Sequence, residues 1–387
     1  NTAWPWQLPT PKAAITGISS SGGSSSRART EFSMVFNIIE PTLNSYTGHC
    51  YSLVEAIAQA APVDQVRIWA GRESVKFWHG PGQIEPYFFR AIRKFQSYFL
   101  FKRLLAKPGK LLLSTAGTSD LILLDWAASE LIPQNKVYLY VHWLGAKVSK
   151  AAKLAKIARN QPNLEILCAT ASTTSFFKEL GFKATTVAYP RAQAELKMQP
   201  VQPFKHLLFA GAARLDKGFD HIADLVEDFA QTRAGWPIWV QASSTHQAKH
   251  DPAISAQIAK IRQSGYLNLT LLENTLSPQD YQAMFPGAIS IQPYSASDFE
   301  DRVSGVTLDA LSAGCPVVVT ANTWLGRIVM KHNAGVVTDD LSPSGLKSAV
   351  DEIMRDYAGY SQRAAHAGQL LRHEYSAGEM MTAIFSN

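Results

Sequence analysis

The residues best suited to chemistry lie in a loop of the C-terminal half, just before a predicted helix. Glu300, Asp301 and Arg302 precede Ser304 and Gly305, which open that helix. The first N–H groups of a helix have no acceptor within it, and the helix dipole favours an anion at that end. The loop therefore predicts a phosphate site formed by Arg302 and the amides of Ser304 and Gly305, although Ser304 is equally well explained as an ordinary N-cap.

Three further positions extend this pattern. Asp309 lies eight positions after Asp301, two turns into the helix, so Asp301 can reach sugar hydroxyls while Asp309 reaches a ribose. Earlier in the chain, Arg214 and the pair Lys217-Gly218 follow an apolar run. A Lys-Gly pair after a strand is ordinarily a solvated turn. Beside the acidic loop, however, the two cations can stabilise the charge of a departing diphosphate.

The whole stretch resembles the signature of glycosyltransferase family 4. That signature is an acidic residue, seven residues and a second acidic residue, followed by Ala, Gly and Pro-Val-Val. The positions in register with it are Asp301, Asp309, Ala310, Gly314, Pro316, Val317 and Val318. The family also places an Arg and a Lys-Gly pair at the donor diphosphate. Here Lys217-Gly218 matches the pair, and Arg214 stands at a shifted position.

The resemblance implies both a fold and a reaction. The fold is α/β of the GT-B type, with two Rossmann-like, doubly wound domains facing a central cleft. The reaction is a retaining transfer of sugar from a nucleotide-diphosphate sugar, such as a UDP- or GDP-sugar, without a metal or other cofactor. The resemblance gives the catalytic roles to His142, at the end of a predicted strand, and to Asp301 or Glu300. A single His at a strand end is otherwise more often structural.

Two other pairs of residues are candidates for the same site. Glu273 and Asn274 follow a predicted strand, and we expect them to border the pocket of the nucleotide base. Gly48 and His49 close the loop after the first strand, where a glycine lets the backbone approach donor and acceptor. A simple turn before the next helix explains Gly48 equally well.

Short apolar runs alternate with longer helix-like segments, which predicts parallel strands joined by crossover helices. Expected strands lie at 34–39, 66–70, 111–114, 137–142, 165–169, 185–188, 206–210, 238–241, 269–272, 288–292 and 316–320. Prolines near residue 200 suggest a linker. We expect a flexible tail at 1–30, an acceptor-binding domain at 31–200, and a nucleotide-sugar-binding domain with closing helices at 201–387.

Composition narrows the class of protein. The length of 387 residues suits two domains, and no apolar run reaches the roughly 20 residues of a spanning helix. The three cysteines form no C-x-x-C pair, so neither a disulfide framework nor a zinc site is expected, and a reducing cytoplasm fits. The net charge of +6 suggests an anionic partner: nucleic acid, an acidic membrane or a phosphorylated substrate.

The segment 86–110 interleaves aromatic and basic residues and contains no acid. On a helix this pattern suits an anionic membrane interface, and the acceptor would then be lipid-linked. An ordinary amphipathic helix with its aromatics in the core and a solvated basic face explains the pattern equally well.

These observations predict a cytoplasmic glycosyltransferase. If the segment 86–110 binds a membrane, the protein would be peripheral at the inner face of the plasma membrane. Its acceptor would be a saccharide or a lipid-linked sugar in envelope polysaccharide or glycolipid synthesis. One alternative is a sugar-nucleotide epimerase of the same fold. A second is a non-enzymatic protein that binds anionic surfaces. Nucleic acid is not an expected partner, because the basic residues concentrate in one segment rather than over a continuous face.

Overall fold

A computed structural model describes residues 34–45, 49–143, 150–191, 201–243 and 251–386 of the chain. Residues from Met34 onward form one compact unit. The tail expected at 1–30 and the glycine expected to approach the ligands, Gly48, lie outside the described residues. So does the side chain of His49, although its backbone begins a helix.

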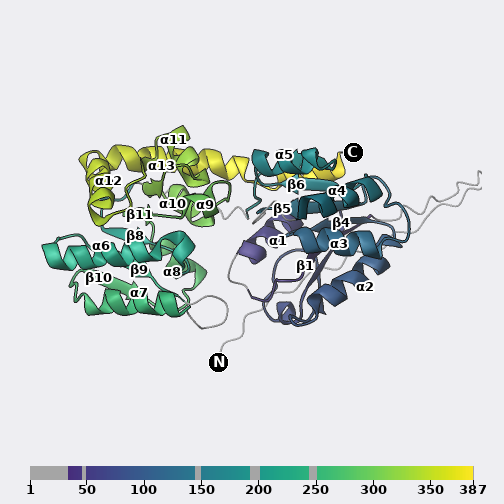
Figure 1. Ribbon diagram of the computed structural model, residues 1–387, viewed down its shortest axis with the longest axis horizontal. Coiled ribbons are helices and arrows are strands. Elements are labelled where there is room, and N and C mark those ends of the chain that lie inside the picture. Colours follow the sequence, from purple (N-terminus) through teal and green to yellow (C-terminus); the bar gives the residue numbers. More distant parts are fainter. Residues whose placement is uncertain (1–33, 46–48, 144–149, 192–200, 244–250, 387) are drawn as a thin grey trace, which may run out of the picture. The chain divides into compact units, whose positions relative to one another are not determined.

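The first sheet is parallel throughout, and its strands run in the order β3-β2-β1-β4-β5-β6-β7 (Figure 1). The strands are β1 (Val35–Glu40), β2 (Gln65–Gly71), β3 (Gln83–Phe88), β4 (Lys110–Leu113), β5 (Val137–Val141), β6 (Glu165–Cys168) and β7 (Lys183–Thr186). Central strands such as β4 and β5 are buried along their whole length, as expected of a parallel sheet covered on both faces.

The helices of this half connect successive strands. They are α1 (His49–Ala60), the 3₁₀ turn η1 (Arg72–Lys76), α2 (Arg93–Leu105), α3 (Thr118–Ala127), α4 (Ala151–Asn160) and α5 (Ala171–Glu179). The sequence did not predict β3 within the aromatic and basic segment. The interpretation of that segment as helical is therefore wrong for 86–88, and α2 begins only at Arg93.

The second sheet repeats the same arrangement in the order β10-β9-β8-β11-β12-β13, again parallel. Its strands are β8 (His206–Phe209), β9 (Ile238–Gln241), β10 (Leu269–Leu272), β11 (Ala288–Gln292), β12 (Val317–Thr320) and β13 (Gly335–Thr338). The ranges 238–241, 269–272 and 288–292 match the sequence prediction to the residue, whereas β13 was not predicted.

The helices of this half are again crossovers, followed by a helical C-terminal end. They are η3 (Leu215–Lys217), α6 (Phe219–Thr232), α7 (Pro252–Gln263), α8 (Pro278–Ala283), α9 (Ala296–Phe299), α10 (Gly305–Ser312), α11 (Trp324–His332), α12 (Pro343–Arg355), α13 (Tyr357–Glu374) and α14 (Gly378–Phe385).

The last helix, α14, contacts the first sheet rather than the second. The Lys110 Nζ donates to the Ile384 carbonyl at 2.7 Å, and the Tyr138 hydroxyl donates to the same oxygen at 3.1 Å. The ring of Phe385 packs edge-on against Phe36, with 5.2 Å between ring centroids. The end of the chain therefore completes the core of the first half.

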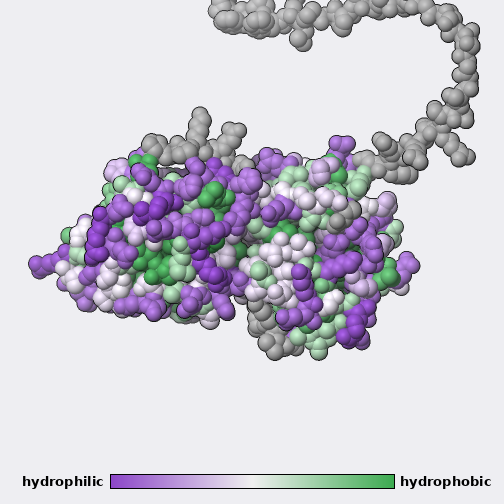
Figure 2. All heavy atoms as spheres, turned by 90° about the horizontal axis from the view of Figure 1, so that it is seen from above, coloured by the Kyte–Doolittle hydropathy of each residue, from purple (hydrophilic) through white to green (hydrophobic). Residues whose placement is uncertain are grey.

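Among the described residues, no helix is long and apolar enough to cross a membrane. Figure 2 shows one face of the molecule, on which hydrophilic and hydrophobic residues are interspersed. Scattered apolar residues of this kind are usual on a folded protein.

Candidate functional site

The order of strands locates the site before any side chain is considered. In each sheet the chain reverses its direction of winding between two adjacent strands, β1 and β4 in the first and β8 and β11 in the second. In open α/β sheets, ligands bind beyond the carboxyl ends of the strands at such a switch point. The loops after β8 and β11 carry the residues that the sequence singled out in the C-terminal half, Arg214 to Lys217 and Glu300 to Gly305.

The Lys-Gly pair is held by the backbone of the neighbouring loop. Gly218 has a left-handed conformation with φ of 67°, and a Cβ there would lie 2.0 Å from the Pro293 carbonyl oxygen. Only glycine fits this position. A Cβ on Gly211, at the other side of the loop, would lie 2.8 Å from the Lys217 Nζ. The ammonium group of Lys217 therefore lies directly beside the backbone of Gly211.

Lys217 is one of three cations at this switch point. Arg214 donates to Asp216 at 2.8 Å, and Arg302 donates to the same carboxylate at 3.2 Å. The Lys217 Nζ lies 5.5 Å from the centroid of the Tyr294 ring. Burial, and then repulsion by Arg214, lowers the pKa of Lys217 to about 8. An anion bound here would relieve that repulsion.

The start of α10 completes this group of cations. The Ser304 side chain accepts a hydrogen bond from the Thr307 N–H at 3.3 Å, so its hydroxyl is the N-cap of the helix. This observation supports the interpretation of the Ser304 side chain as an N-cap. The backbone N–H groups of Ser304 and Gly305 have no acceptor within the helix. A Cβ on Gly305 would meet nothing within 4 Å, so the helix start is open on that side.

Asp309, predicted to reach a ribose, is held by two groups that sequence reasoning missed. Arg191 forms an ion pair with one of its oxygens, and the Tyr281 hydroxyl donates to the other at 3.1 Å. Burial by itself would lower the pKa of Arg191, but the charge of Asp309 raises it overall. Arg191 lies just after the last strand of the first sheet, over a hundred positions before Asp309. The residues around it in the sequence gave no indication of this ion pair.

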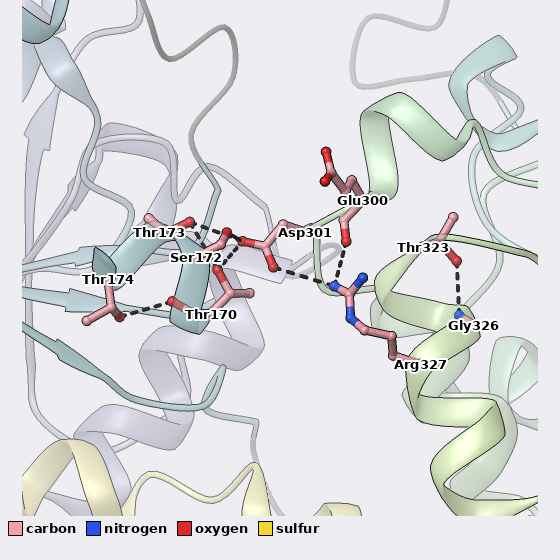
Figure 3. Close-up of polar contacts among 9 residues, drawn as sticks. All are labelled: Thr170, Ser172, Thr173, Thr174, Glu300, Asp301, Thr323, Gly326 and Arg327. Carbon is pink, nitrogen blue, oxygen red and sulfur yellow. Dashed lines mark hydrogen bonds and ion pairs between the residues drawn. The ribbon is translucent and has the colours of Figure 1, made fainter. Parts of the chain in front are cut away.

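Asp301 is engaged by the first turn of α5 (Figure 3). Its Oδ2 accepts hydrogen bonds from the hydroxyls of Thr170, Ser172 and Thr173, and its Oδ1 lies 3.6 Å from Arg327. The loop after β11 is thereby joined to the N-terminal half. A run of Ser and Thr after β6 was the only sequence signal for these partners.

Glu300, the rival for the first acidic role, points away from this network (Figure 3). Its side chain is exposed, and its contact with Arg327 is made by the backbone carbonyl. The structure thus brings Asp301, and not the Glu300 carboxylate, to the residues of α5.

The remaining candidates occupy separate places. His142 follows β5, and its ring centroid lies 6.0 Å from that of Tyr189. The guanidinium carbon of Arg302 lies over the ring of the next residue, Trp143, 4.8 Å from the ring centroid. The end of β5 therefore lies beside the cationic loop. Glu273 and Asn274 are exposed beyond the edge strand β10, where Glu273 pairs with Arg262.

The switch point of the first sheet holds a buried carboxylate that the sequence analysis missed. Glu40 ends β1 and is 0% exposed. It accepts hydrogen bonds from Ser114 at 2.8 Å and Thr115 at 2.6 Å, both after β4, and from the Thr42 N–H at 3.1 Å. The position of Glu40 at a strand end was visible in the sequence, but its partners come from a distant strand.

No group of three or more His, Cys, Asp or Glu side chains within the described ranges is arranged to hold a metal ion. Cys50, Cys168 and Cys315 form no disulfide in that part of the chain. The groups gathered at the second switch point are Asp216, the cations around it and helix N–H donors, and the donors among them are suited to anionic oxygens.

Comparison with known proteins was made with both sequence and structure. No protein-family model matches the sequence, and no curated protein matches it. HepE from Anabaena, solved with UDP-glucose, superposes with a TM-score of 0.67 at 12% identity, over 91% of this chain and 99% of that one. Sucrose-phosphate synthase from Thermosynechococcus elongatus gives 0.65 at 13% identity, over 91% and 98%. WaaG, a glycosyltransferase involved in lipopolysaccharide biosynthesis, gives 0.61 at 12% identity, over 91% and 100%.

These three neighbours are GT-B glycosyltransferases. Identities this low establish the fold alone. The chain therefore has the GT-B fold, with two Rossmann-like halves built on parallel sheets, and the predicted fold class is confirmed.

Proposed function

We propose that this protein is a glycosyltransferase that takes a sugar from a nucleotide-diphosphate donor bound in its C-terminal half. The observation that carries the proposal is the convergence of Arg214, Lys217 and Arg302 with the start of α10 at the switch point between β8 and β11. The fold shared with HepE, whose solved complex contains UDP-glucose, supports the same donor class.

The chemistry requires positive charge at this place. When the sugar leaves, the nucleoside diphosphate gains negative charge in the transition state. Pre-positioned donors that meet this charge lower the barrier without reorganising. Lys217, the two arginines and the helix N–H groups would take this role, and we propose that they do so without a metal. A retaining reaction, in which the leaving phosphate assists the incoming hydroxyl on the same face, is our expectation from the family 4 resemblance.

The other donor contacts that we propose are those expected from the sequence. Asp309 would bind the ribose hydroxyls, with Arg191 and Tyr281 holding its carboxylate in place. Glu273 and Asn274 would border the base. We propose His142 and Asp301 as the groups nearest the transferred sugar. We further propose a saccharide or lipid-linked acceptor, a role in envelope polysaccharide or glycolipid synthesis, and a cytoplasmic location.

The test is nucleotide binding by thermal shift and calorimetry, with UDP, GDP, ADP and CMP. A ligand that binds only the folded state raises its apparent stability. We expect one diphosphate to stabilise the protein and CMP to have no effect. Lys217→Ala should weaken that diphosphate by about 10- to 100-fold, because a charge-assisted contact is lost. Lys331→Ala, which removes an exposed lysine paired with Glu374, is the matched control and should bind normally.

Release of the nucleoside diphosphate from the corresponding sugar donor then separates the classes of function. Turnover on addition of a saccharide or lipid-linked acceptor supports the transferase. Conversion of the sugar nucleotide without an acceptor would favour an epimerase. If none of the four nucleotides shifts the melting temperature of the folded protein, the donor site does not exist and the proposal fails.

A further inference from the structure

The segment 86–110 has a divided role in the structure. Phe88, Leu100, Phe101 and Leu104 are buried in the core of the first half. Lys110 is buried as well, where its Nζ caps the Ile384 carbonyl. These residues fit the interpretation of the segment as an ordinary amphipathic helix with its apolar side chains in the core. They account for only part of the segment.

The opposite side of the segment exposes large apolar side chains. Phe89 is 45% exposed, Ile92 51%, Phe95 65% and Phe99 47%. Phe95 and Phe99 lie one helical turn apart on α2 and pack edge to face, with 4.7 Å between ring centroids. Four large apolar residues within eleven positions are a surface cluster rather than scattered exposure, and clusters of this kind mark interaction sites.

Cations surround this cluster. The exposed Arg90 and Lys94 lie among the apolar residues, and the exposed Lys102 lies on the next turns of α2. Arg72 adds a guanidinium 4.5 Å from the centroid of the Phe89 ring. We call Phe89, Ile92, Phe95, Phe99, Arg90, Lys94 and Lys102 the α2 surface.

Asp120 of α3 is close enough to Lys94 for an electrostatic interaction, but the cations of the α2 surface have no acid in their own segment. No Asp or Glu occurs between positions 86 and 110. Within the described ranges, none of the ion pairs includes a cation of the α2 surface. A shallow hollow of about 430 Å³ is lined by residues 90–95 and opens among these cations.

We propose that the α2 surface binds the interface of an anionic lipid bilayer. The apolar side chains would enter the boundary between headgroups and acyl chains, while Arg90, Lys94 and Lys102 contact lipid phosphates. Charge complementarity argues for this occupant, because each cation has an anionic headgroup to meet and each exposed ring leaves water. The inference goes beyond the proposed function and does not depend on it.

A bilayer explains the pattern better than a nucleic acid does. Single strands are bound by rings whose faces are free to stack on bases. Here Phe95 and Phe99 use each other as edge-to-face partners, and the aliphatic Ile92 belongs to the same cluster. An aliphatic and aromatic cluster ringed by Arg and Lys is typical of a segment lying in a membrane interface.

The experiment is co-sedimentation of the full chain with vesicles of phosphatidylcholine alone, or containing about one third phosphatidylglycerol. We expect binding to the anionic vesicles that weakens as salt is raised, because the charge contacts are screened. The double variants Phe95→Ser/Phe99→Ser and Arg90→Gln/Lys94→Gln should each weaken binding by about tenfold or more. The matched control is Leu267→Ser, which replaces an apolar residue that is 96% exposed in the second half and should bind like the wild type.

Three results would overturn the inference. They are an absence of wild-type binding to anionic vesicles, equal binding by wild type and both double variants, or stronger loss from Leu267→Ser than from the α2 variants. Binding of a single-stranded RNA oligonucleotide that depends on Phe95 and Phe99, without vesicle binding, would assign the surface to nucleic acid instead. The nucleotide-induced thermal shift should persist in both double variants, so failure here is distinct from failure of the donor site.

Discussion

The two sheets have the same order of strands around their switch points but opposite chemistry there. In the first, Glu40 is a buried carboxylate surrounded by hydroxyl donors. In the second, Arg214, Lys217 and Arg302 gather around Asp216 and the open start of α10. The fold therefore decides where a ligand can bind, and the side chains decide which ligand is accepted.

We infer that the side chains at the first switch point stabilise the fold, whereas those at the second bind a ligand. The Glu40 carboxylate is satisfied by the protein itself, so the first switch point is a fixed internal network. At the second, three cations lie close together, and burial and the charge of Arg214 lower the pKa of Lys217 to about 8. A bound anion would therefore relieve the repulsion between these cations. We expect substitutions at the first point to change stability, and those at the second to change binding.

The largest expected effect is on the backbone that supports the cationic switch point. Gly218→Ala would place a Cβ 2.0 Å from the Pro293 carbonyl at a φ of 67°, so the loop must move. We expect a loss of about 3 kcal/mol or more in the free energy of unfolding, because steric overlap adds to the left-handed strain. Denaturant unfolding measures the change.

Gly265→Ala is the matched control for this substitution. Gly265 has a similar φ of 63°, but nothing lies within 4 Å of an added Cβ. Only the strain of about 1 kcal/mol should appear. Equal losses in the two variants would show that contact with Pro293 does not constrain the Lys217 loop.

An intermediate effect is expected at the first switch point. Glu40→Gln replaces two carboxylate acceptors by one carbonyl and adds an N–H₂ group among hydroxyl and N–H donors. We expect a loss of about 1 to 3 kcal/mol in unfolding free energy, with diphosphate affinity changed by less than about twofold. Glu73→Gln, at an exposed pair with Lys76, should stay within about 0.5 kcal/mol of the wild type. A large loss of nucleotide affinity in Glu40→Gln would contradict the expectation that the first switch point affects stability and not binding.

The smallest effect is the pH dependence of donor binding. The pKa of Lys217 is lowered to about 8 by burial and by Arg214, so its charge is lost as the pH rises through that value. We expect diphosphate affinity to fall by about 3- to 10-fold between pH 7 and pH 9, because the arginines remain charged. Titration calorimetry at several pH values measures it. Lys217→Arg should flatten the profile, and an unchanged profile in that variant would exclude Lys217 as the titrating group.

The same lowered pKa fixes the sign of a stability effect. The unfolded chain keeps the Lys217 proton to a higher pH than the folded protein does, so unfolding takes up a proton between about pH 8 and pH 10. The contribution of Lys217 therefore favours folding more as the pH rises through this window. Lys217→Met should remove that trend and raise stability near neutral pH in the absence of ligand, as expected where binding and stability compete.

Sequence reasoning succeeded where the signal is local. The alternation of apolar runs predicted most strands of both sheets, because buried parallel strands are largely apolar. It missed β3, where Pro86 and Glu85 interrupt the pattern, and β13, which begins with a glycine. Ser304 was recognised as an N-cap candidate because capping depends on residues three positions apart.

The partners of the acids could not have been predicted in the same way. Asp301 is bound by Thr170 and Ser172, and Asp309 by Arg191, each from more than a hundred positions away. A carboxylate has no preferred partner in the sequence, because many hydroxyls and cations can satisfy it equally well. Whether the acids contact the sugar and the ribose, as the family 4 resemblance implies, stays a prediction.

The sequence alone determined the α/β class, the position of the Lys-Gly turn and the start of α10, since each follows from periodicity or from backbone needs within a few residues. Only the tertiary structure decided which side chains share a switch point, which half α14 completes, and which aromatics of 86–110 face water. Those choices depend on strand order and crossover packing, which bring together residues that are far apart in the chain. Their free energies arise from contacts that no local pattern encodes.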